Sequence, residues 1–153
     1  MKSVDTREYL SVLEKMIRNG ETVGIPVSGF SMNPFLADKR DQVIVKRPDS
    51  SLKRGDIVLY KRKNGQYILH RIWKDRADGY YMVGDGQTRI EGPVSGSQII
   101  GKVIRIKRKG KWIDEQDRVW RFFETVWIRI VPCRPVLRKA YSWVVRMRAK
   151  KKM

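Results

Sequence analysis

Short apolar or alternating runs, separated by turn sequences, extend from residue 21 to residue 107. The clearest turn is Lys63-Asn64-Gly65, because Asn-Gly between two apolar runs is a strong β-hairpin signal. Runs this short and this closely spaced predict a mainly β fold, a coiled antiparallel sheet of barrel-like or sandwich form. The predicted strands are residues 22–27, 42–46, 57–60, 66–73, 80–83, 99–106 and 112–113.

The predicted strand at residues 66–73 carries the only histidine of the chain. A strand presents alternate side chains to opposite faces of its sheet. Two sets follow: Ile68, His70 and Ile72 on one face, and Tyr67, Leu69 and Arg71 on the other.

Helical periodicity replaces the strand pattern at both ends of the chain. Residues 5–18 predict a short amphipathic helix, capped by Asp5 or Thr6 and ended by Asn19-Gly20. Near the C-terminus two amphipathic stretches are separated by Pro132 and Pro135. We therefore predict an N-terminal helix packed on the core (1–20), a β domain (21–115) and a basic amphipathic helical tail (116–153).

The net charge of +18 is concentrated in the tail. Residues 118–153 hold 11 lysines and arginines against one acid, Glu124, so more than half of the excess lies in the last quarter of the chain. Such asymmetry indicates an anionic partner, either a membrane surface or nucleic acid. A membrane would place Trp120, Trp127 and Trp143 near the lipid headgroups. Nucleic acid is the weaker interpretation. The alternative to both is that the apolar helix faces of the tail pack on the β core or on a second chain.

Several classes of protein are excluded by what the chain lacks. One cysteine, Cys133, rules out an internal disulfide, and with one histidine it leaves too few ligands for a structural zinc site. We expect no metal and no cofactor. The N-terminus is too polar for a signal peptide, and no stretch approaches the roughly 20 apolar residues of a membrane span. The expected location is cytoplasmic, with peripheral attachment to the inner face of the membrane as a further hypothesis.

Three separated segments would combine into a hydrolytic site. Gly29 lies two residues before Ser31 and Pro34 three residues after it, which favours a loop that exposes a hydroxyl next to backbone N–H groups. His70 would accept its proton, and Asp85 or Glu91 would orient the imidazole ring. Each residue also has an ordinary interpretation: a loop serine, a core histidine, a turn aspartate and a surface glutamate.

The order of these segments resembles that of the S24/S26 serine peptidases, the superfamily of type I signal peptidases and LexA-like proteins. The resemblance covers about residues 24–106, and a histidine before the arginine is similar to the archaeal and endoplasmic-reticulum signal peptidases. It implies the coiled all-β core of that superfamily. The matching motifs are residues 28–34 (SGFSMNP), 55–58 (GDIV), 69–72 (LHRI), 83–86 (VGDG) and 99–103 (IIGKV).

The resemblance also implies residue roles and a reaction. Ser31 would be the nucleophile and His70 the general base, and the third group would be Glu91 or Asp85. Oxyanion and substrate contacts would come from Ser28, Gly29, Met32 and the Ser31 N–H. The predicted function is a serine endopeptidase that cleaves a peptide or protein through an acyl-enzyme. The alternative is a non-catalytic binding module of the same fold that uses its basic tail to bind a membrane or nucleic acid.

Overall fold

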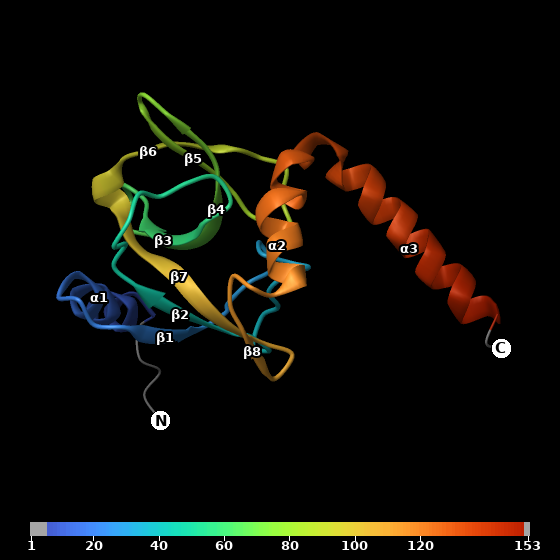
Figure 1. Cartoon of the computed structure of the whole chain (residues 1–153), viewed down its shortest axis with the longest axis horizontal. Coiled ribbons are helices and arrows are strands. Elements are labelled where there is room, and N and C mark those ends of the chain that lie inside the picture. Colours follow the sequence, from blue (N-terminus) through green and yellow to red (C-terminus); the bar gives the residue numbers. More distant parts are fainter. Residues whose placement is uncertain (1–5, 152–153) are drawn as a thin grey trace.

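A computed structural model describes residues 6–151 as one antiparallel sheet with helices at both ends (Figure 1). The strand order is β1-β2-β7-β3-β4-β5-β6, with β8 paired to β7. The prediction of a mainly β fold with an antiparallel sheet is confirmed. The strands are β1 (Val23–Pro26), β2 (Gln42–Lys46), β3 (Ile57–Lys61), β4 (Tyr67–Arg76), β5 (Gly79–Val83), β6 (Glu91–Val94), β7 (Ile99–Arg108) and β8 (Lys111–Ile113).

The sequence does not predict β6, because Gly92-Pro93 is typical of a turn. In the structure Glu91 pairs with Met82 of β5, and Val94 pairs with Tyr80. β6 lies at the edge of the sheet, where a proline without an N–H is tolerated. This pairing carries Glu91 to the face of the sheet that also bears His70.

The larger hydrophobic core joins one face of the sheet to two helices, α1 (Thr6–Arg18) and α2 (Arg118–Thr125). Ile17 of α1 is fully buried, and α1 lies against β1 and β7. Asp117 caps α2 by accepting a hydrogen bond from the Trp120 N–H. The Phe123 ring of α2 stacks on Phe35 with 4.9 Å between the centroids. The suggested cap at Asp5 lies outside the described residues.

The expectation that three tryptophans lie at headgroup level is wrong for two of them. Trp120 is only 6% exposed and Trp127 only 7%, because both cover the core around Phe35 and Phe123. Trp143, in contrast, is 63% exposed. The tail therefore contains two parts, one packed on the sheet and one exposed.

A second core occupies the opposite face of β3 and β4. It contains Val58, Tyr60 and Ile72, with Ile68 packed against it, whereas Leu69 belongs to the larger core. The predicted alternation of β4 is thereby confirmed for these residues. His70 lies next to Tyr60 on the side of the second core.

The exposed part of the tail is α3 (Arg134–Lys151), which follows the short 3-10 turns η2 (Trp127–Arg129) and η3 (Val131–Cys133). Figure 1 shows α3 leaving the body of the molecule and extending away from the sheet. Arg134, at its first turn, is the buried member of this helix within the described length. No helix in the described part of the chain is long and apolar enough to cross a bilayer.

Candidate active site

The segment from Val27 to Leu36, here called the serine loop, is held by backbone hydrogen bonds and by its buried side chains. The Val27 N–H donates to the Asp41 carbonyl, and the Leu36 N–H donates to the Met32 carbonyl. Gly29 adopts a φ of +85°, which favours glycine, and its N–H donates to Asp38 Oδ1. Four side chains of the loop itself are buried in the core, whereas Ser31 is half-buried. The four are Val27, Met32, Phe35 and Leu36.

The turn from Gly84 to Gln87, here called the glycine turn, lies directly against the serine loop. The Gly86 N–H donates to the Ser31 carbonyl at 2.8 Å. A Cβ at Gly84 would collide with that same carbonyl oxygen, and one at Gly86 would lie 2.9 Å from the Asn33 carbonyl oxygen. Only glycine permits this approach of the two backbones, so both glycines position Ser31.

Asp85, between these glycines, is fully buried and bound to Arg71. The Arg71 guanidinium donates from Nε and Nη2 to the two carboxylate oxygens, each at 2.8 Å, and from Nη1 to the Gly55 carbonyl. Trp127 Nε1 donates to the Asp85 carbonyl. Both Asp85 oxygens accept hydrogen bonds from Arg71, so this ion pair holds the glycine turn in place.

His70 and Glu91 are connected through a hydroxyl. Tyr60 Oη lies 3.3 Å from His70 Nδ1 and donates to Glu91 Oε2 at 2.7 Å. Arg62 binds both oxygens of the same carboxylate. Of the two candidate acids, Glu91 is the one that the structure links to His70, by way of Tyr60.

Burial and charge determine the protonation of this group. His70 is only 5% exposed, and its burial lowers the pKa of the imidazole to about 4, with Glu91 opposing and Arg62 reinforcing the effect. Burial also acts to raise the pKa of Glu91, but hydrogen bonds from Arg62 and Tyr60 outweigh it and keep that pKa below its ordinary value. The site therefore holds a neutral imidazole near an ionised carboxylate at neutral pH.

Ser31 and His70 flank the glycine turn from two sides. Ser31 contacts it through Gly84 and Gly86, whereas His70 lines a polar hollow of about 450 Å³ together with Gln87 and Glu91. Within residues 6–151 no hydrogen bond joins Ser31 Oγ to His70. β5 ends at Val83, opposite Arg71, and leaves Tyr67–His70 paired only with β3. Ser31 lies beside this free stretch of β4, because it lines the same groove as Tyr67 and Leu69.

An apolar groove of about 440 Å³ opens beside Ser31. Its walls come from α1 and from strands β1 to β4, and Ser28, Ser31 and Met32 also line it. Apolar wall residues outnumber polar ones, which suits an extended peptide with apolar side chains. The wall residues include Tyr9, Leu10, Ile25, Val27, Val43, Leu59, Tyr67 and Leu69.

Comparison with known proteins identifies the family of this fold. The family model described as Peptidase S24-like matches residues 2–104, about two thirds of the chain. The chain belongs to the Peptidase S24-like family. A comparison with curated proteins finds no match. The matched part contains the serine loop, β4, the glycine turn and β6, and it ends before α2.

Two residues of the candidate site carry no signal in the sequence. Tyr60 is the last residue of an apolar run, and its role depends on the pairing of β3 with β4. Arg134 is one of many basic residues, yet it is buried and donates to the carbonyls of Gly84, Gln87 and Trp127. Burial lowers the pKa of Arg134 to about 10, which leaves it charged at neutral pH.

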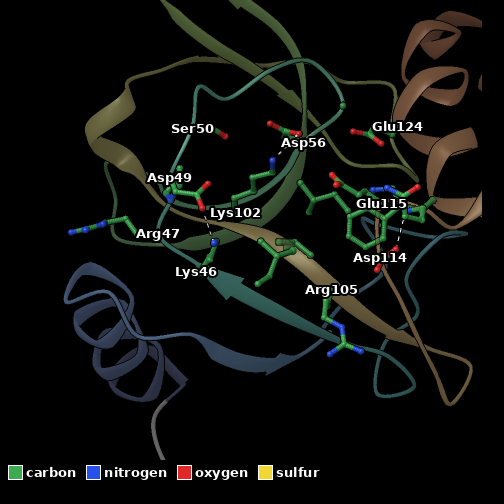
Figure 2. Close-up of a pocket in the computed structure, with 17 residues that line it drawn as sticks. Lys46, Arg47, Asp49, Ser50, Asp56, Lys102, Arg105, Asp114, Glu115 and Glu124 are labelled. Carbon is green, nitrogen blue, oxygen red and sulfur yellow. Dashed lines mark hydrogen bonds and ion pairs between the residues drawn. The ribbon is translucent and has the colours of Figure 1, made fainter.

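A second polar hollow contains none of the predicted site residues. Figure 2 shows its charged side chains, which come from β2, β7, α2, the segment between β2 and β3 and the segment before α2. Lys46 pairs with Asp49 at 2.8 Å, and Lys102 lies 3.6 Å from Asp56. Across the described residues no three His, Cys, Asp or Glu side chains come together as a metal site.

Proposed function

We propose that this S24-like domain is a serine endopeptidase with Ser31 as its nucleophile. The observation that carries the proposal is the position of Ser31, held by the glycine turn beside an apolar groove and the free stretch of β4. An extended peptide in this groove would lie beside β4 and present a carbonyl carbon to Ser31 Oγ. The substrate class is therefore a peptide or an extended protein segment.

The donor and acceptor roles around Tyr60 favour His70 as the base. A tyrosine hydroxyl has one hydrogen, and Tyr60 donates it to Glu91, so its oxygen accepts from His70 Nδ1–H. Nε2 is then the unprotonated nitrogen, which is the tautomer that a general base requires. In this proposal Glu91 orients the imidazole through Tyr60, and Asp85 positions the serine loop through the glycine turn.

The reaction follows from these roles. Ser31 Oγ attacks the peptide carbonyl carbon while His70 Nε2 takes the hydroxyl proton, and the oxyanion is bound by the Ser31 N–H and by Ser28. The C–N bond breaks as His70 returns the proton to the leaving amine, and water then hydrolyses the ester. Hydrogen bonds of this kind tighten when substrate binds, so the proposal requires Ser31 and His70 to meet in the substrate complex.

The test compares cleavage of a peptide library by the full-length chain and its variants, read by mass spectrometry. We expect Ser31→Ala and His70→Ala to abolish cleavage while circular dichroism shows an intact fold. Ser51→Ala is the matched control, because Ser51 is exposed and lies outside the site. Cleavage retained by Ser31→Ala, or none by the unaltered chain, would contradict the proposal.

A non-catalytic binding module of the same family is the second candidate. Its supporting observation is the burial of His70, which makes no hydrogen bond to Ser31 within the described residues. A fluorophosphonate probe separates the two candidates when it is applied to the unaltered chain and to Ser31→Ala. Labelling that depends on Ser31 favours the peptidase, whereas peptide binding without labelling or cleavage favours the module.

A further inference from the structure

The exposed helix α3 has an apolar stripe that no part of the described chain covers. Val136 is 69% exposed and Trp143 63%, and Leu137, Val144 and Met147 are also exposed. Separations of three, four and seven residues place these side chains on one side of the helix. Apolar side chains gathered in this way favour an interaction surface over a solvated spacer.

The charge of α3 restricts the partner. Its sequence contains seven lysines and arginines and no acidic residue. Two such helices would repel each other, which disfavours a second copy of this chain as the partner. An anionic surface would be attracted instead.

The arrangement of the charges matches a planar surface. Arg134 and Arg138 lie on the side turned toward the body, since Arg134 is buried and Arg138 Nη2 lies near Gly86. Arg146 and Lys150 follow Trp143 at intervals of three and four residues, which places them beside the apolar stripe. Long basic side chains beside an apolar stripe reach lipid phosphates while the stripe enters the headgroup region.

From these observations we infer that α3 docks on an anionic lipid bilayer, lying in the headgroup layer with its apolar stripe inward. Nucleic acid would engage the same charges but would leave the stripe without a partner. This inference is independent of the proposed peptidase chemistry. It has one consequence for the site: Arg134 joins the start of α3 to the glycine turn, so docking would hold the serine loop close to the membrane.

The experiment measures sedimentation of the full-length chain with vesicles. One set contains phosphatidylcholine alone, and the other about three parts phosphatidylcholine to one part phosphatidylglycerol. We expect binding to the anionic set only, weakened by salt. The stripe variant Leu137→Gln/Val144→Gln should lose at least about tenfold in affinity. Its matched control, Tyr141→Gln/Val145→Gln, removes two exposed apolar residues outside the stripe and should lose less than about twofold.

A second pair of variants tests the placement of charge. Arg146→Glu/Lys150→Glu and Lys63→Glu/Lys111→Glu each replace two basic residues by acidic ones, so they lower the net charge equally. Only the first pair should weaken vesicle binding. The inference is overturned if the stripe variant binds like the unaltered chain or if both charge pairs act equally. It is also overturned if duplex DNA binding is retained by the stripe variant and outcompetes vesicles, or if the chain forms a dimer that the stripe variant dissociates.

Discussion

Protonation of His70 offers a direct test of the site, because the chain contains one histidine and its ring signals are unambiguous in NMR spectra. Burial lowers the pKa of His70 from 6.5 to about 4, a difference of roughly 3 kcal/mol between the two protonation states. A ring titration should therefore show a midpoint near 4. At neutral pH the nitrogen shifts should report a proton on Nδ1, the nitrogen that faces Tyr60.

Two variants should move this midpoint in opposite directions. Arg62→Gln removes a positive charge that lowers the pKa of His70, so the midpoint should rise. Glu91→Gln removes a negative charge that raises it, so the midpoint should fall further. A midpoint near 6.5 in the unaltered chain, or the same response to both variants, would refute this account of the site.

The same pKa difference should appear in folding stability. The folded pKa of about 4 lies below the unfolded value of 6.5, so the unfolded chain binds more protons between these values. The free energy of unfolding should therefore decrease as the pH falls from 6.5 to 4, by up to about 3 kcal/mol. Urea unfolding of the unaltered chain and of His70→Gln isolates this part from the carboxylates, since only the unaltered chain should show it.

Two further predictions concern the residues that hold Ser31. Gly84→Ala should displace the serine loop, cost about 1–3 kcal/mol in urea unfolding and reduce peptidase activity at least about tenfold, whereas Gly96→Ala, whose added Cβ meets no atom within 4 Å, should change little. Equal effects of the two alanines would contradict the close approach described above. Arg71→Met should cost about 3–5 kcal/mol because it leaves the buried Asp85 carboxylate unpaired, and Arg71→Met/Asp85→Asn should recover part of that loss. If the free energy of unfolding of Arg71→Met lies within about 1 kcal/mol of that of the unaltered chain, the ion pair is not important for stability.

The sheet was predictable because its signals are local. Alternation placed His70 and Ile72 on one side of β4, and Asn64-Gly65 marked the turn before it. β6 was not predictable, since Gly92-Pro93 reads as a turn unless its pairing with β5 is known. The missed strand matters because it carries Glu91 to Tyr60.

The candidate site was predictable as a set of segments but not as a set of contacts. Sequence alone left both Glu91 and Asp85 as candidates for the third group. The structure distinguishes them because Arg71 occupies both Asp85 oxygens, whereas Glu91 reaches His70 through Tyr60. Those contacts depend on the pairing of distant strands, which no local pattern encodes.

Arg134 links the family core to the segment beyond it, and this determines how α3 should be studied. The match to the S24-like family ends at residue 104, yet Arg134 donates to the carbonyls of Gly84 and Gln87, and Trp127 donates to that of Asp85. Deleting residues 118–151 would remove these donors, leave the Asp85 carbonyl without its Trp127 donor and uncover Phe35. Loss of activity after such a deletion would therefore say nothing about membrane docking. Substitutions on the exposed stripe of α3 leave Arg134 and Trp127 in place, so they test the helix without disturbing the site.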